Sequence, residues 1–167
     1  MTRSSDNMRR DPFDLDRFIQ GQEMNHSYER AIAEIRSGRK TSHWIWYVFP
    51  QMAGLGQSEL SVKYGIRSLE EARAYLRHPV LRKRLRDAVL EMVAHAGRLT
   101  AQDILDPLDA MKLRSCLTLF SAVDQDCVFS EALVYLFGGR PCERTLAIIS
   151  REMPDACAGP RTAHSPV

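Results

Sequence analysis

Three polar residues in one apolar segment are the first candidates for chemistry. Asp109, Lys112 and Ser115 follow one another at intervals of three in "LDAMKLRSCLTLFSAV". In a helix this spacing places side chains along one face, so the three can line a strip beside a cavity. Lys112 could then anchor a phosphate or carboxylate while Ser115 and Thr118 donate hydrogen bonds. The alternative is a purely structural Asp109–Lys112 pair at the helix surface.

The second candidate is the run "SHWIWYVFPQMAGLGQS" at residues 42–58, which contains both tryptophans of the chain. Its aromatic side chains could simply anchor the core, because aromatics bury the most area per residue. A binding interpretation adds the polar residues beside them and the glycines, whose backbone can approach a ligand closely. We assign Trp44 to the core and Trp46 to a pocket wall. The predicted ligand-binding residues are Trp46, Gln51, Gly54, Gly56, Ser58, Lys112, Ser115 and Thr118.

Catalysis would fall to His43, Lys112 or Asp109, although the sequence identifies no acid–base partner for any of them. A histidine beside an aromatic cluster is commonly a packed residue with one backbone hydrogen bond. The other histidines form no i, i+4 pair, and the four cysteines show no C-x-x-C spacing. We therefore predict reduced thiols and no metal site.

The Gly54-Leu55-Gly56 turn does not indicate a nucleotide cofactor. It follows no recognisable strand and lacks the remainder of a dinucleotide or phosphate-loop motif. We therefore reject a Rossmann or Walker assignment and predict no cofactor.

The basic segment "RHPVLRKRLR" at residues 77–86 raises the question of nucleic acid binding. Leu81 and Leu85 place one face of this segment inward, and no aromatic residue is interleaved with the basic ones, as single-strand binding would require. The pattern favours an ordinary solvated stripe over a nucleic acid partner.

Composition indicates one cytoplasmic domain. The chain has 167 residues, 44% of them hydrophobic, and a formal net charge of +2, which suits a single core and gives no electrostatic indication of a partner. No secretory signal is visible, and no stretch approaches the roughly 18 apolar residues of a membrane span. We predict cytoplasmic localisation and no membrane partner.

Helical spacing dominates the chain, and no segment sustains a period of two. Start signals stand at Ser68 with Glu71, at Pro79, at Asp106-Pro107, and at Asp124 or Asp126, either of which can cap the next helix. Stop signals stand at Gly38 and Gly138, and the helix from Pro79 is expected to run to Gly97. The predicted fold is all-α, a single compact multihelical domain of about seven to nine short helices. We place the domain at residues 11–153, with disordered ends at 1–10 and 154–167, and its core at Leu113, Leu117 and Phe120.

These motifs together resemble a known family. Ser42 to Ser58, with a second motif at Lys112, Arg114, Ser115 and 118–120, is similar to the bacterial domain-of-unknown-function 1810 family over about residues 11–149. Cys116 stands where many relatives carry a second serine. The resemblance implies a mainly helical fold and no established activity. Some members bear the label calpastatin, which the dense apolar helices contradict, because a disordered inhibitor would lack a core.

Two hypotheses from different classes follow. The first is a small-ligand pocket protein for a nucleotide- or sugar-like compound with an anionic group, acting as a hydrolase or N-glycosidase. The choice of reaction rests on analogy with other small helical bacterial N-glycosidases. The second is a non-catalytic helical module that binds a partner protein. A cavity that holds His43, Gln51 and Lys112 together would favour the first.

Overall fold

Every regular element in the described part of the chain is a helix. The structure is a computed structural model that describes residues 10–152. Within them the only β-type pairing is an isolated parallel bridge between Met52 and Ile66, so the predicted all-α fold is confirmed. The predicted disordered ends lie outside the described residues, apart from residue 10. The helices are α2 (Asp16–Glu23), η1 (Met24–His26), α3 (Ser27–Ser37), α4 (Ile45–Val48), α5 (Glu59–Tyr64), α6 (Leu69–Arg77), α7 (Pro79–Val93), α8 (Ala101–Leu105), α9 (Pro107–Val123), α10 (Val128–Phe137) and α11 (Glu143–Glu152).

Several helices begin or end at the residues that the sequence indicated. Ser68 accepts the Glu71 backbone N–H at 3.0 Å and opens α6. Gly38 ends α3 with a φ of 80°, which a residue without Cβ adopts without strain. α7 and α9 each start with a proline, which has no N–H to leave unpaired in the first turn.

Three local features differ from the predictions. α7 ends at Val93 rather than near Gly97, because turns follow it. The N-cap of α10 is Cys127 without a side-chain cap bond, whereas Asp126 pairs with Arg86. α5 and α8 were not predicted, although Thr100 and Asp103 form a capping box at the start of α8.

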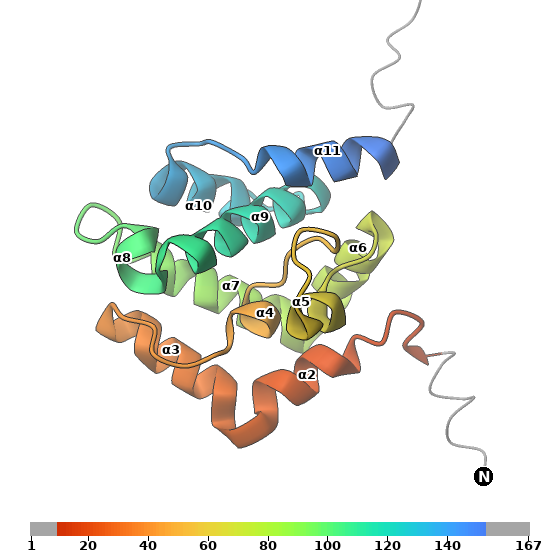
Figure 1. The fold of residues 1–167 in the computed structure, drawn as a ribbon, viewed down its shortest axis with the longest axis horizontal. Coiled ribbons are helices and arrows are strands. Elements are labelled where there is room, and N and C mark those ends of the chain that lie inside the picture. The colour runs from red at the N-terminus through yellow and green to blue at the C-terminus, as the bar shows by residue number, and fades with distance from the viewer. Residues whose placement is uncertain (1–9, 153–167) are drawn as a thin grey trace, which may run out of the picture.

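The helix α9 occupies the centre of the molecule. It packs against α4, α6, α8, α10 and α11, and in Figure 1 it lies between α10 and α11 on one side and α2 and α3 on the other. Leu113, Leu117 and Phe120 are fully buried on it, so the predicted core is confirmed. α9 therefore provides the fixed surface on which neighbouring segments are placed.

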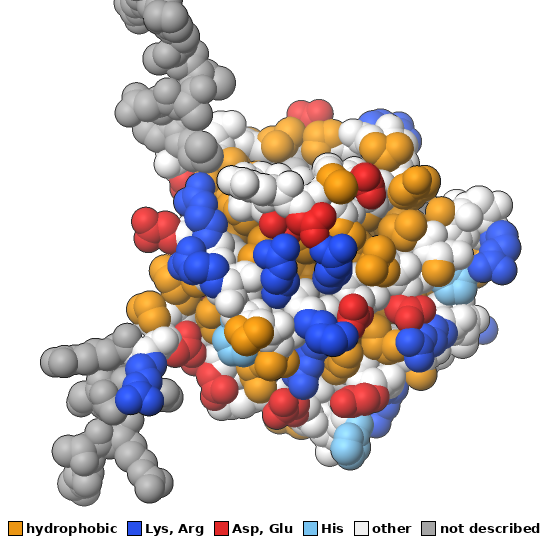
Figure 2. Space-filling model, turned by 180° about the vertical axis from the view of Figure 1, so that it is seen from behind, with side chains coloured by type: hydrophobic (Ala, Val, Ile, Leu, Met, Phe, Trp, Pro, Cys, Tyr) orange, Lys and Arg blue, Asp and Glu red, His pale blue; other side chains and the backbone are white. Residues whose placement is uncertain are grey.

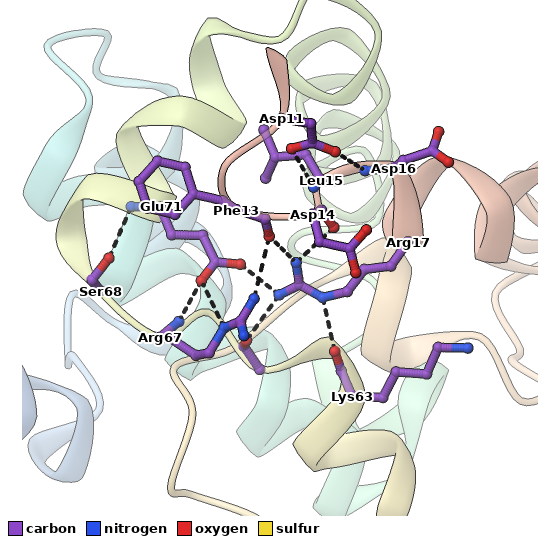
Figure 3. A network of polar contacts seen from close by, with 11 residues as sticks. Asp11, Phe13, Asp14, Leu15, Asp16, Arg17, Lys63, Arg67, Ser68 and Glu71 are labelled. Carbon is purple, nitrogen blue, oxygen red and sulfur yellow. Dashed lines mark hydrogen bonds and ion pairs between the residues drawn. The ribbon is translucent and has the colours of Figure 1, made fainter. Parts of the chain in front are cut away.

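A saturated polar cluster joins α2 to the start of α6 (Figure 3). Arg17 and Glu71 form a buried ion pair at 2.5 Å. Glu71 also accepts the backbone N–H of Arg67 at 2.8 Å. The other guanidinium N–H groups of Arg17 donate to carbonyls, so all five of its donors are used. These carbonyls belong to Phe13, Asp14, Lys63 and Gly65.

A pair of hydrogen bonds closes the chain segment that contains α5. The Ile66 N–H donates to the Gln51 carbonyl at 2.9 Å, and the Ala53 N–H donates to the Ile66 carbonyl at 2.8 Å. The bridge fixes both ends of residues 53–65 against each other. It thereby holds the glycine-containing loop before α5 in a defined position.

Candidate functional site

A small hollow forms where the loop after α4, the first half of α9 and the start of α11 meet. Its volume is about 230 Å³, below the roughly 300–1,000 Å³ of pockets that enclose drug-sized ligands. It suits a compact molecule or one end of a larger one. We call it the Lys112 pocket. Its lining residues are Gln51, Leu55, Gly56, Leu108, Met111, Lys112, Ser115, Cys142 and Arg144.

Lys112 is held at the pocket wall by Asp109, one helical turn away. Its Nζ lies 2.9 Å from Asp109 Oδ1, and Lys40 Nζ lies 2.8 Å from Asp109 Oδ2. Burial alone would raise the pKa of the Asp109 carboxyl, but hydrogen bonds from Lys40 and Lys112 outweigh it and lower the pKa. One carboxylate is thus shared by two ammonium groups, and an excess of positive charge remains beside the pocket.

Arg144 supplies a second cation from α11. It is exposed, and among residues 10–152 its side chain forms no hydrogen bond or ion pair. A guanidinium can bind a carboxylate or phosphate through two parallel hydrogen bonds. Lys112 and Arg144 therefore give the pocket the character of an anion site.

Gln51 brings an amide into the same pocket. The residue is 9% exposed, and its backbone is fixed by the bridge to Ile66. Its side-chain amide forms no hydrogen bond with any described residue, although buried polar groups are normally paired. The amide is thus available to a bound molecule.

The structure favours glycine at positions 54 and 56 of this loop for two different reasons. Gly54 has a φ of 92°, which favours a residue without Cβ. A Cβ added to Gly56 would lie 2.5 Å from Ser61 Oγ, so close packing requires glycine there. Only Gly56 lines the Lys112 pocket, whereas Gly54 lies outside it.

Each of the two tryptophan rings has a lysine ammonium group close to it. Trp44 is fully buried, with Lys40 Nζ 5.4 Å from its ring centroid. Trp46 is half-buried, and Lys112 Nζ lies 5.6 Å from its ring centroid, at a distance suited to a cation–π contact. The Trp46 Nε1 atom is buried without a partner among the described residues. Trp46 therefore supports Lys112 beside the pocket and does not line it.

Glu34 braces the loop that leads to the tryptophans. Its carboxylate accepts the Thr41 N–H at 2.8 Å and the Trp44 indole N–H at 2.7 Å, and it also bonds to Ser42. Burial alone would raise the pKa of Glu34, but the hydrogen bonds from Ser42, Thr41 and Trp44 lower it from 4.5 to about 2. The carboxylate thus remains ionised and fixes Trp44.

The other predicted site residues lie outside the pocket or have structural partners. His43 is exposed and does not line the pocket, so His43, Gln51 and Lys112 are not all brought together. Ser58 caps α5 by accepting the Ser61 N–H at 3.2 Å. The Thr118 hydroxyl donates to a carbonyl of its own helix and accepts the Cys142 N–H at 2.8 Å.

Several pocket residues were missed by sequence reasoning. Ser115 lines the pocket as expected from α9, but its hydroxyl already bonds to the buried Thr145 hydroxyl at 2.7 Å. Arg144 precedes Thr145 and enters the pocket because this bond sets α11 against α9. No local pattern marks that contact. The other unpredicted lining residues are Leu55, Leu108, Met111 and Cys142.

The basic segment of α7 is largely paired with acids. Arg82 lies 3.7 Å from Asp124, and Arg86 pairs with Asp126. Lys83 pairs with Asp87 on the same helix. Figure 2 shows basic side chains interspersed with acidic ones over the back of the molecule. Because these acids neutralise the basic side chains, we expect this surface to attract the phosphate backbone of a nucleic acid only weakly.

Residues 10–152 contain no helix that is both long and apolar enough to span a bilayer. No three His, Cys, Asp or Glu side chains gather there as a metal ion would require. Cys116, Cys127 and Cys142 are free thiols, and Cys157 lies outside the described residues.

The helical fold and the sequence together identify the family. Residues 12–149 match the family described as protein of unknown function (DUF1810), and the chain belongs to this family. The crystal structure, at 1.38 Å, of the conserved hypothetical protein Rv1873 from Mycobacterium tuberculosis is similar, with a TM-score of 0.80 and 42% identity. The similarity covers 84% of this chain and 99% of that one. A comparison with curated proteins finds no match.

Proposed function

We propose that this protein binds a small molecule whose anionic group occupies the Lys112 pocket. The observation that carries the proposal is the Gln51 amide, which belongs to a largely buried residue, is unpaired among the described residues, and lies in a hollow with two cations. A ligand can supply the hydrogen-bond partner that the protein does not give this amide, and Lys112 and Arg144 add attraction for the charge of the ligand.

The support is stronger for binding than for hydrolysis. The residues that line the pocket include no Asp, Glu or His among those described, whereas cleavage of an N-glycosidic bond calls for a group that moves a proton. Asp109 is engaged by two lysines, and His43 is elsewhere. A hydrolase or N-glycosidase reaction on a nucleotide- or sugar-like compound is the activity we would test once a ligand is found.

A thermal-shift screen tests the proposal. We would compare nucleotides, ADP-ribose derivatives and sugar phosphates, because a ligand at 100 times its Kd stabilises the folded state by about 2.7 kcal/mol. The shift should disappear in Arg144→Gln and persist in Arg73→Gln, a charge-matched change at an exposed residue of α6 outside the pocket. Shifts equal in both variants would rule out this pocket as the site.

Cys142 offers an independent readout of occupancy. It lines the Lys112 pocket, whereas Cys127 is exposed at the start of α10 and lines neither this pocket nor its rim. A bound ligand should slow alkylation of Cys142 by iodoacetamide and leave the rate at Cys127 unchanged. Equal rates at Cys142 with and without ligand would contradict binding in the pocket.

One observation favours the alternative, a non-catalytic interaction module. Leu108 is 71% exposed and Met111 is 57% exposed, and both rim the Lys112 pocket on α9. A partner helix could cover such side chains. This function would be favoured over ligand binding by two results together. No compound in the screen would raise the Tm, and a partner protein would bind the wild type but not Leu108→Glu.

A further inference from the structure

A second hollow lies beside the Lys112 pocket, on the other flank of α9. Its volume is about 370 Å³. α8, α9 and the end of α10 form its walls, and we call it the Arg114 pocket. Its lining residues are Thr100, Ala101, Gln102, Ala110, Met111, Arg114, Leu136, Phe137, Gly138 and Arg140.

Met111 lines both hollows and is the ridge between them. The helical turn places Lys112 and Ser115 on one side of this ridge and Ala110 and Arg114 on the other. The two hollows therefore lie within about 10 Å of each other, since a helix with its side chains is about that wide. The segment after α10 spans both, because Arg140 enters one hollow and Arg144 the other.

Each hollow holds two cations. The Arg114 side chain forms no hydrogen bond or ion pair within residues 10–152. Arg140 donates only to the Phe137 carbonyl, at 3.4 Å. Neither hollow has an Asp or Glu among its described lining residues. Positive charge thus gathers at two points of one surface, with the exposed, apolar Met111 between them.

We propose that a single ligand with an anionic group at each end bridges the two pockets across Met111. The proposal rests on the function proposed for the Lys112 pocket and adds the second anchoring point. Arg114 and Arg140 hold one anionic group through guanidinium hydrogen bonds, and Lys112 and Arg144 hold the other. The middle of the ligand contacts the Met111 thioether, which adapts to apolar groups. A bis-phosphorylated small molecule has this chemistry.

Alkylphosphonates and alkane bisphosphonates of increasing chain length test the bridge by isothermal titration calorimetry on the full chain. We expect a bisphosphonate whose groups lie up to about 10 Å apart to bind at least about tenfold more tightly than the monophosphonate. Arg114→Gln/Arg140→Gln should remove this gain and leave only the monophosphonate binding that the Lys112 pocket provides. Arg73→Gln/Arg77→Gln, at exposed α6 residues outside both pockets, should keep the gain.

The outcomes separate the two proposals. Equal affinity for mono- and bisphosphonates, with monophosphonate binding lost in Arg144→Gln, overturns the bridge and leaves the Lys112 pocket as a single anion site. A gain that survives Arg114→Gln/Arg140→Gln also overturns the bridge. No binding by any phosphonate overturns both proposals. Arg140→Gln alone, at an exposed residue, repeats the test if the double variant shows a lowered Tm.

Discussion

Two clusters of buried polar side chains differ in how fully their hydrogen-bonding groups are used. In the first, Arg17 uses all five donors and Glu71 accepts from both arginine neighbours (Figure 3). In the second, Gln51 is 9% exposed as a residue, and its amide has no hydrogen-bond partner among the described residues. The first cluster joins helices, and the second faces a hollow.

The difference separates groups that stabilise the fold from groups available for binding. A saturated cluster has no capacity left for a ligand, and its removal leaves a buried charge behind. An unsaturated group contributes little to folding, because its loss deletes no contact within the protein. Substitutions in the two clusters should therefore have opposite effects on stability and on binding.

The largest effect on stability is expected from Glu71→Ala. It leaves the Arg17 guanidinium buried without its carboxylate, which should lower the free energy of unfolding by about 3–5 kcal/mol. Arg67→Ala removes an exposed side chain that lies 3.4 Å from Glu71 and donates to the Phe13 carbonyl at 3.3 Å, and it should lower the free energy of unfolding by less than about 1 kcal/mol. Urea unfolding measures both. Similar losses in the two variants would mean that the cluster is not the brace we describe.

Glu34 gives a pH-dependent test of a second saturated group. Its pKa is about 2 in the folded protein against 4.5 ordinarily, so its contribution is complete above pH 4.5 and is lost as the pH falls toward 2. The shift corresponds to about 3 kcal/mol at most. The gap in unfolding free energy between wild type and Glu34→Gln should narrow over this pH range. A constant gap would show that the carboxylate charge contributes nothing.

Gly56→Ala should have an intermediate effect. The added Cβ would lie 2.5 Å from Ser61 Oγ and 2.8 Å from Ser61 Cβ, and such crowding typically costs about 1–3 kcal/mol. Differential scanning calorimetry would measure this loss. The combination with Ser61→Gly removes the clash and should recover stability, and a failure to recover would place the strain elsewhere.

The smallest effect on stability is expected from Gln51→Ala. Because no described group bonds to its amide, the free energy of unfolding should change by less than about 0.5 kcal/mol. Ligand-induced stabilisation should be lost in the same variant. If Gln51→Ala instead unfolds the protein, its amide braces the fold and the comparison between the two clusters fails.

Helix ends were predictable because their signals are local. Ser68 with Glu71, Pro79 and Gly38 act within one turn of their own positions, so their roles follow from the sequence alone. The start of α8 carries the same kind of signal at Thr100 and Asp103, and it could have been recognised. The predicted cap of α10 at Asp124 or Asp126 was wrong, because Cys127 is the N-cap and Asp126 pairs with Arg86, which is distant in the sequence.

The candidate site was less predictable because its residues meet through tertiary packing. Lys112 could be recognised from the sequence, because a charged residue in an apolar helix is visible without knowledge of its tertiary contacts. Arg144 stands in an ordinary amphipathic segment and becomes relevant only when Thr145 bonds to Ser115 across two helices. His43 precedes α4, and its position outside the pocket is likewise marked by no local pattern.

The contact between Lys112 and Trp46 makes the indole an optical reporter of the pocket. Indole emission responds to a charge near the ring, and a ligand that draws Lys112 toward itself changes the field at Trp46. Trp44 is buried and has Lys40 Nζ 5.4 Å from its ring centroid, and Lys40 shares Asp109 with Lys112, so the emission of Trp44 is not independent of the pocket. In Trp44→Phe the remaining fluorescence would come from Trp46 alone, and occupancy could be followed without any added dye.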